Sequence, residues 1–299
     1  MDHLTSPSSP QLSVEHIQQL AAYAKALGHA KAHTKAHILA GSLLSKKKGH
    51  GLDLHEIRPY TTHDEVRHMD WRITARTGTP HIKVYSEEIE HRSFIILQLS
   101  QDAYFGTQTT FISTRYAQLA ALIAWRSHAR KETVGAQLQF GQQQYSYPTI
   151  KDWQSFAMHL SQSTNIAERD TSSTNFSLSP LPSLRGQSVM ILSDQIWFDK
   201  ALEIHLAQLA QHNRVYWISL EDPNLFALPN GQYTFAHQTE SGPSHINERS
   251  KQQAQQRYQQ QQQAFNQQLH ALGVQHLSFD VNDSPIAIAR TLLARGVIH

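Results

Sequence analysis

The chain has no cysteine and little charge, and both shortages restrict its chemistry. Without cysteine it can form no disulfide, thiol nucleophile or thiolate metal site. Charged residues make up 17% of the 299 residues and the net charge is only +2, which argues against a dedicated polyelectrolyte binder. No apolar run reaches the roughly 18 residues that a membrane-spanning helix needs, and the first residues lack the pattern of a secretory signal. We therefore expect a cytoplasmic protein without a transmembrane segment.

The sequence also lacks the common short motifs of nucleotide binding and hydrolysis. It contains no GxxxxGKS or GxxxxGKT loop and no GxGxxG loop after a strand, so no phosphate-cradling loop is expected. There is no GxSxG elbow. There is no HExxH pair either, because His63 and His68 are five residues apart. The chain is nevertheless long enough to bury a sizeable core.

Strands and helices alternate through the last two thirds of the chain. The runs FIILQLS and SVMILSD are almost continuously apolar, which is typical of buried strands in parallel sheets. Further strands are expected at 134–140, 143–149, 214–220 and 277–281, and helices at 113–131, 150–162, 199–211, 249–272 and from 284 onward. This alternation predicts an α/β fold with a doubly wound, mainly parallel sheet over residues 93–299.

The N-terminal region divides into two parts. Residues 1–12 are rich in proline and serine and are expected to form a disordered tail. Residues 13–50 are expected to form a helix from about 14 to about 40, capped by Ser13 and followed by a basic loop. Its apolar stripe consists of Ile17, Leu20, Ala24 and Leu27. Three histidines repeat every four residues and could bind a metal, but they point away from this stripe, which favours a solvated face: His29, His33 and His37.

The glutamine-rich run at 249–272 has two interpretations. Such composition is found in low-complexity, aggregation-prone segments. We prefer a helix, because apolar residues keep a rough helical period through the run: Ala254, Tyr258, Phe265, Leu269 and Leu272.

Residues 51–92 form a segment with a dense mixture of charged and aromatic side chains. Eight of these lie close together in sequence: Glu56, Arg58, Tyr60, Asp64, Arg67, Asp70, Trp71 and Arg76. Such groups can form an arginine–carboxylate network that pins a segment to the protein body, or a binding face for a partner. We favour the network, and expect the segment to pack on the α/β domain with Trp71 buried. An arginine at 58, 67 or 76 should then pair with an aspartate at 64 or 70.

Polar side chains follow two of the expected strands. Ser100 and Asp102 come at the end of FIILQLS, and Asp194 ends SVMILSD. In a doubly wound sheet, ligands bind at the carboxyl ends of strands near the point where the strand order reverses. We therefore expect the two strands to be neighbours, with Ser100 and Asp194 within about 10 Å of each other. Together these groups could hold Mg²⁺, or they could simply cap the next turns.

The stretch GLDLHEIRPYTTHDEVRHMDWRITAR, followed by these strands, resembles the signature of the bacterial domain-of-unknown-function 58 family. The resemblance covers about residues 50–299. That family is similar to von Willebrand factor type A domains, whose doubly wound sheet often holds a metal-ion-dependent adhesion site. Its members work beside MoxR-type AAA+ ATPases as adaptors in assembly or maturation, so the resemblance implies such a partner and no catalytic activity.

The metal-binding pattern of type A domains, D-x-S-x-S, is altered in this sequence. The aligned positions are Gln98, Ser100 and Asp102. Asp194 matches the second acidic position, and Thr174 is the candidate threonine ligand. The resemblance thus implies a degenerate site for Mg²⁺ or Mn²⁺. We expect weak or absent binding, because an amide attracts a cation less than a carboxylate does and Mg²⁺ dehydrates reluctantly.

Three functional hypotheses follow. The leading one is a non-enzymatic protein-interaction module that recruits an unknown client to a MoxR-type AAA+ ATPase. The first alternative is a metal-assisted hydrolase using Asp102 and Asp194 with a nearby histidine as base. The second is nucleic-acid binding through the lysines between residues 31 and 48. These lysines lack interleaved aromatic residues for base stacking, so no nucleic-acid partner is expected.

Overall fold

The computed structural model shows an α/β protein with two compact units. One consists of residues 1–31 and 91–299, and the other of residues 32–90. We call them the main unit and the extension unit. The structure describes residues 7, 9–28, 52–62, 64–87, 91–108, 110–168, 184–197, 199–227, 229–235 and 242–299.

The main unit contains a six-stranded sheet with the order β10-β7-β6-β3-β4-β5. Its strands are β3 (Arg92–Leu99), β4 (Thr133–Phe140), β5 (Gln143–Tyr147), β6 (Ser188–Ser193), β7 (Arg214–Glu221) and β10 (Gln275–Asp280). All neighbouring pairs are parallel except β4 and β5, which form an antiparallel hairpin. This confirms the expected mainly parallel sheet, with the two most apolar strands, β3 and β6, side by side in its centre.

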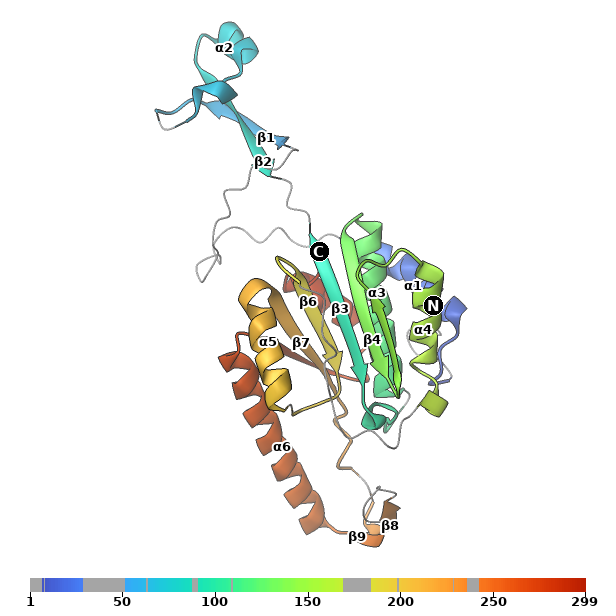
Figure 1. Cartoon of the computed structure of the whole chain (residues 1–299). Helices are drawn as coiled ribbons and strands as arrows, with labels where there is room; N and C mark the ends of the chain where they lie inside the picture. The colour runs from blue at the N-terminus through green and yellow to red at the C-terminus, as the bar shows by residue number, and fades with distance from the viewer. Residues whose placement is uncertain are drawn as a thin grey trace. The chain divides into compact units, whose positions relative to one another are not determined.

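Helices cover both faces of the sheet (Figure 1). One face packs against α1 (Val14–Ala26), α3 (Ile112–Ala129), α4 (Trp153–Gln162) and α7 (Pro285–Ala294), and the other against α5 (Lys200–His212) and α6 (Glu248–Ala271). Successive side chains of β3 point to opposite faces of the sheet, so β3 contributes to two separate core clusters. Ile95 and Leu97 belong to the first cluster, whereas Phe94 and Ile96 belong to the second. The doubly wound arrangement expected from the sequence is therefore present.

Helix α1 confirms the predicted cap and stripe but is shorter than predicted. The Ser13 side chain accepts a hydrogen bond from the backbone N–H of His16. All four stripe residues are buried. The helix ends at Ala26 rather than near residue 40, and Gly28 adopts a left-handed φ of 84°, which stops a right-handed helix. The histidine ladder and the lysines between 31 and 48 lie outside the described residues.

The chain just before the Ser13 cap is more ordered than we expected. Leu12, which we placed in a disordered tail, is buried. Its N–H donates to Thr164 Oγ1 over 2.9 Å, and its carbonyl accepts from the Ser161 hydroxyl over 2.6 Å. The chain is thus anchored to the end of α4 before α1 begins.

The described residues of the extension unit form an antiparallel hairpin, a 3₁₀ turn and a short α-helix. The hairpin joins β1 (Leu52–Pro59) to β2 (His81–Glu87). Between the strands lie a 3₁₀ turn (Val66–His68) and α2 (Trp71–Thr77). The sequence indicated β2 but not β1.

A second small hairpin in the main unit was not predicted either. It joins β8 (Gly231–Phe235) to β9 (Gly242–Ile246) and precedes α6. Within the described part of the chain, no helix has both the length and the apolar character needed to cross a membrane.

Candidate functional site at the carboxyl edge of the sheet

The sheet has its topological switch point between β3 and β6. After β3 the chain continues to β4 on one side, and later returns to β6 on the other. In doubly wound sheets the crevice at the carboxyl ends of such strands is the usual ligand site. The side chains that follow β3, β6 and β7 are therefore the groups to consider.

The structure brings Ser100 and Asp194 into direct contact across this switch point. The Ser100 backbone N–H donates to Asp194 Oδ1 over 2.9 Å, and the Ser100 hydroxyl donates to Asp194 Oδ2. The prediction that the two residues lie within about 10 Å is confirmed. Ser100 also caps the 3₁₀ turn at Gln101–Ala103, because its Oγ accepts from the Asp102 N–H over 3.0 Å. The interpretation of Ser100 as a cap is therefore confirmed, whereas its role as a metal ligand stays a prediction.

Asp194 occupies an unusual electrostatic position. Burial raises the pKa of its carboxyl group above the ordinary value, and the negative charge of Asp102 adds to this effect. The two hydrogen bonds from Ser100 lower the pKa and oppose the shift, but they do not outweigh burial. Asp194 is thus a carboxylate whose charge is stabilised mainly by one neighbouring residue.

Gln98, which stands where the metal pattern has its first aspartate, is buried. Its Oε1 has no hydrogen-bond partner among the described residues. An amide oxygen is an acceptable ligand for a hard cation. However, the Ser100 hydroxyl and the Asp194 carboxylate already satisfy each other, so an ion would have to break that bond. The donor set fits Mg²⁺ in type, but two of its members, Ser100 and Asp194, are bonded to each other.

The other two predicted metal ligands are Asp102 and Thr174. Asp102 has an exposed side chain, and Thr174 lies outside the described residues. Among the residues that the structure describes, no three histidine, aspartate or glutamate side chains gather closely enough to hold a metal ion.

Asp222, at the end of β7, holds the loop after β3 in place. It accepts hydrogen bonds from the Thr107 N–H over 2.8 Å and from the Thr107 hydroxyl over 2.6 and 2.7 Å to its two oxygens. The Asn224 N–H also donates to it over 3.0 Å. Asp222 was not among the predicted site residues, although its position directly after a buried strand is the same signal that identified Asp194.

Tyr116 of α3 holds β6 and β7 apart at their carboxyl ends. The ladder between these strands ends at the pair Leu192 and Ile218. Beyond it, the Tyr116 hydroxyl donates to the Ser193 carbonyl over 2.6 Å and accepts from the Leu220 N–H over 3.0 Å. This buried hydroxyl takes the place of a ladder bond, and so sets the spacing between the strand ends that carry Asp194 and Asp222.

The extension unit contains one of the expected arginine–carboxylate pairs. Arg58 Nη1 and Nη2 donate to the two oxygens of Asp64 over 2.8 and 2.6 Å. The Thr61 N–H and hydroxyl also donate to Asp64, each over 2.8 Å. These bonds hold the pKa of the Asp64 carboxyl well below its usual range. Arg67 pairs with Glu65 instead, and the side chain of Glu56 is not among those described.

Trp71 is 66% exposed, so the prediction that it is buried is wrong. It is the first residue of α2, whose cap is Asp70. The Asp70 carboxylate accepts from the N–H groups of Arg72 and Ile73 over 3.0 and 3.1 Å and lies 3.5 Å from Lys83 Nζ. Asp70 therefore fixes the start of α2 rather than pairing with an arginine. Val66 is exposed in the same unit, at 54%.

Comparisons with known proteins place the chain in a family without an assigned activity. A stretch of 70 residues is 36% identical to uncharacterized proteins of Mycobacterium bovis and Mycobacterium tuberculosis, and covers 23% of this chain and 22% of each relative. The match thus spans only about a fifth of the length of these relatives. Residues 56–268 match the model of the family described as "Protein of unknown function DUF58", which includes most of the extension unit and the ends of β3, β6 and β7. Because this match extends over more than half of the sequence, the chain belongs to the DUF58 family.

Proposed function

We propose that this protein is a non-enzymatic adaptor that binds a MoxR-type AAA+ ATPase through its extension unit and presents a client to it. The observation that carries the proposal is the exposure of Trp71 at the start of a firmly capped helix. Tryptophan and arginine dominate the energetics of protein interfaces. Trp71 and its neighbour Arg72 are both exposed.

The extension unit is organised in a way that suits a preformed binding surface. The bidentate Arg58–Asp64 pair closes the loop after β1, and the Asp70 cap fixes the first turn of α2. A surface that is already ordered loses less conformational entropy when it binds a partner. These contacts therefore support a docking role for Trp71.

The main unit supports a von Willebrand type A-like architecture. Its sheet is doubly wound, ends in an antiparallel edge strand, and carries Ser100 and Asp194 at the switch point. In type A domains this edge binds partners, often through an ion. We propose that the client contacts this edge here without depending strongly on an ion, because Ser100 and Asp194 already satisfy each other.

The proposal is tested by affinity purification of the full chain from its native cells, with Trp71→Ala and the matched variant Trp197→Ala. Trp197 is also half-exposed, at 49%, but lies in the main unit after β6. We expect the parent and Trp197→Ala to recover a MoxR-type ATPase and Trp71→Ala to lose it. Melting temperatures of the three proteins show whether they are equally folded.

Two outcomes contradict the proposal. One is equal recovery of the ATPase with Trp71→Ala and with the parent. The other is the absence of any AAA+ ATPase from the proteins recovered with the parent chain.

A further inference from the structure

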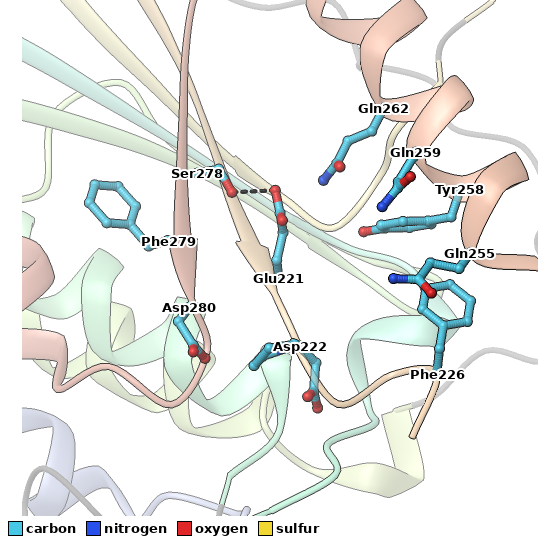
Figure 2. A pocket seen from close by; sticks show the side chains of 11 residues that line it. Glu221, Asp222, Phe226, Gln255, Tyr258, Gln259, Gln262, Ser278, Phe279 and Asp280 are labelled. Atoms are coloured by element: carbon cyan, nitrogen blue, oxygen red, sulfur yellow. Dashed lines mark hydrogen bonds between the residues drawn. The ribbon is translucent and has the colours of Figure 1, made fainter. Parts of the chain in front are cut away.

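A pocket of about 320 Å³ opens beside β7 and β10, at their carboxyl ends, and under α6 (Figure 2). We propose that it binds an organic cation, an alkylammonium or guanidinium group. The pocket is lined by Glu221, Asp222, Pro223, Phe226, Gln255, Tyr258, Gln259, Gln262, Ser278, Phe279 and Asp280. Its size is at the lower end of the range for small-molecule sites, which is about 300–1,000 Å³.

The glutamine-rich helix explains why the pocket exists. In its C-terminal half, the face of α6 toward the sheet carries Phe265 and Leu269, both fully buried. In the N-terminal direction along the helix, the next residues on this face are polar. They are Gln262, Gln259, Tyr258 and Gln255. These residues line the pocket instead of packing against apolar side chains. This face of α6 is polar where it lies beside the strand ends. It is therefore suited to contact a polar ligand rather than to pack in the apolar core.

All of the charged residues that line the pocket are acidic. Its lining includes the carboxylates Glu221, Asp222 and Asp280 and no lysine, arginine or histidine. Among the described residues, these three carboxylates form hydrogen bonds with neutral groups only. The Ser278 hydroxyl donates to Glu221, Thr107 donates to Asp222, and Asn282 donates to Asp280. Three negative charges without a cationic partner attract a cation, and more strongly in a partly enclosed site than in bulk water.

Aromatic rings complete the site. Tyr258 and Phe226 stand edge to face, with ring centroids 5.6 Å apart. Figure 2 shows Tyr258, Gln259 and Gln262 reaching from α6 toward Glu221 on β7. Burial and the charge of Glu221 raise the pKa of Tyr258, which favours the protonated, neutral hydroxyl. Aromatic faces beside carboxylates stabilise ammonium and guanidinium groups by cation–π attraction.

The arrangement favours an organic cation over a metal ion. No three acidic or histidine side chains of the described residues are close enough to share one ion, so the carboxylates of this pocket are spread along it. A guanidinium carries five N–H donors, which suit dispersed carboxylate and amide oxygens. The cation has two possible sources, the side chain of arginine or lysine in a bound peptide and a free polyamine.

The test is calorimetric titration of the full chain with three compounds, N-acetylarginine amide, spermidine and the neutral isostere N-acetylcitrulline amide. We expect saturable binding of a cation with a dissociation constant below about 1 mM. The citrulline compound should bind at least about tenfold more weakly, because it lacks charge-assisted bonds. Binding of the arginine compound alone indicates a peptide source, and binding of spermidine alone indicates a free polyamine.

Single substitutions test whether the cation binds in this pocket. Glu221→Gln should weaken it about tenfold or more. The matched variant Glu203→Gln, which removes an exposed charge from α5, should leave it unchanged. Tyr258→Leu keeps the helix but removes the ring, and should also weaken binding. The proposal would be overturned if neither cation bound, if the citrulline compound bound equally well, or if Glu221→Gln and Glu203→Gln had equal affinity. Circular dichroism must show that the proteins are folded.

Discussion

At the scale of single residues, Asp194 is the group whose chemistry depends most on the fold. Its position could be predicted from the sequence, because a polar residue that directly follows a buried parallel strand must lie at the carboxyl edge of the sheet. Its partner Ser100 was predicted for the same reason. The hydrogen bond between Asp222 and Thr107 could not be predicted, because Thr107 lies in an irregular loop far away in sequence.

The raised pKa of Asp194 predicts a specific dependence of stability on pH. Since the folded protein binds this proton more tightly than the unfolded chain does, the group destabilises the fold as pH rises above about 4. Asp194→Asn removes the charge and keeps an acceptor for the Ser100 N–H. We expect the free energy of unfolding of the variant, relative to the parent, to increase between pH 4 and pH 7, by about 1.4 kcal/mol for each unit of the pKa shift. Urea unfolding at several pH values measures this.

The matched variant for this experiment is Glu203→Gln, which neutralises an exposed carboxylate of α5. Its stability relative to the parent should change little over the same range. A pH-independent difference between Asp194→Asn and the parent would show that the Asp194 carboxyl has an ordinary pKa.

The contact between Ser100 and Asp194 also predicts how the protein responds to metal ions. Calorimetry with Mg²⁺ and Mn²⁺ should show weak binding or none, because an ion must displace this contact and finds an amide at Gln98 in place of a carboxylate. Sub-micromolar affinity that is abolished by Asp194→Ala would mean that the rearranged ligands form a working site.

At the scale of elements, continuous apolar runs for strands and a helical period of apolar residues for helices were the most reliable signals. The strands β3 and β6 and the helices α3, α5 and α6 lie close to their predicted bounds. Strand β1 and the β8–β9 hairpin were missed because they are short or rich in polar residues and glycine, and gain their stability from pairing rather than from an apolar pattern. Helix α1 was predicted too long because a single glycine, Gly28, interrupts a run of good helix formers.

The contact of α3 with β6 and β7 gives a prediction at this scale. Tyr116→Phe removes the hydroxyl and leaves the buried Leu220 N–H and Ser193 carbonyl without their partner. We expect a loss of about 2 kcal/mol or more in the free energy of unfolding. Tyr145→Phe is the matched control, because the bonds of that hydroxyl are long, at 3.4 Å, and its loss should be smaller. Equal stability of both variants would mean that Tyr116 does not hold the strand ends.

At the scale of the whole molecule, the family and the doubly wound sheet could be predicted from the sequence. The exposure of Trp71 could not, and its predicted burial was wrong. Burial was expected because the charged segment was predicted to pack on the α/β domain. The structure shows instead that the network in this segment, Arg58 with Asp64 and the Asp70 cap, is satisfied within the extension unit itself. A network that is complete without Trp71 leaves that side chain available to a partner, which is the basis of the adaptor proposal.

The affinity between the purified chain and the purified MoxR-type ATPase tests this central claim most directly. It is measured with the parent, Trp71→Ala and Trp197→Ala, each with and without a chelator. The account predicts that Trp71→Ala weakens binding at least about tenfold, as expected for an interface hot spot, while Trp197→Ala and the chelator change it little. Equal affinities of the parent and Trp71→Ala would contradict the account.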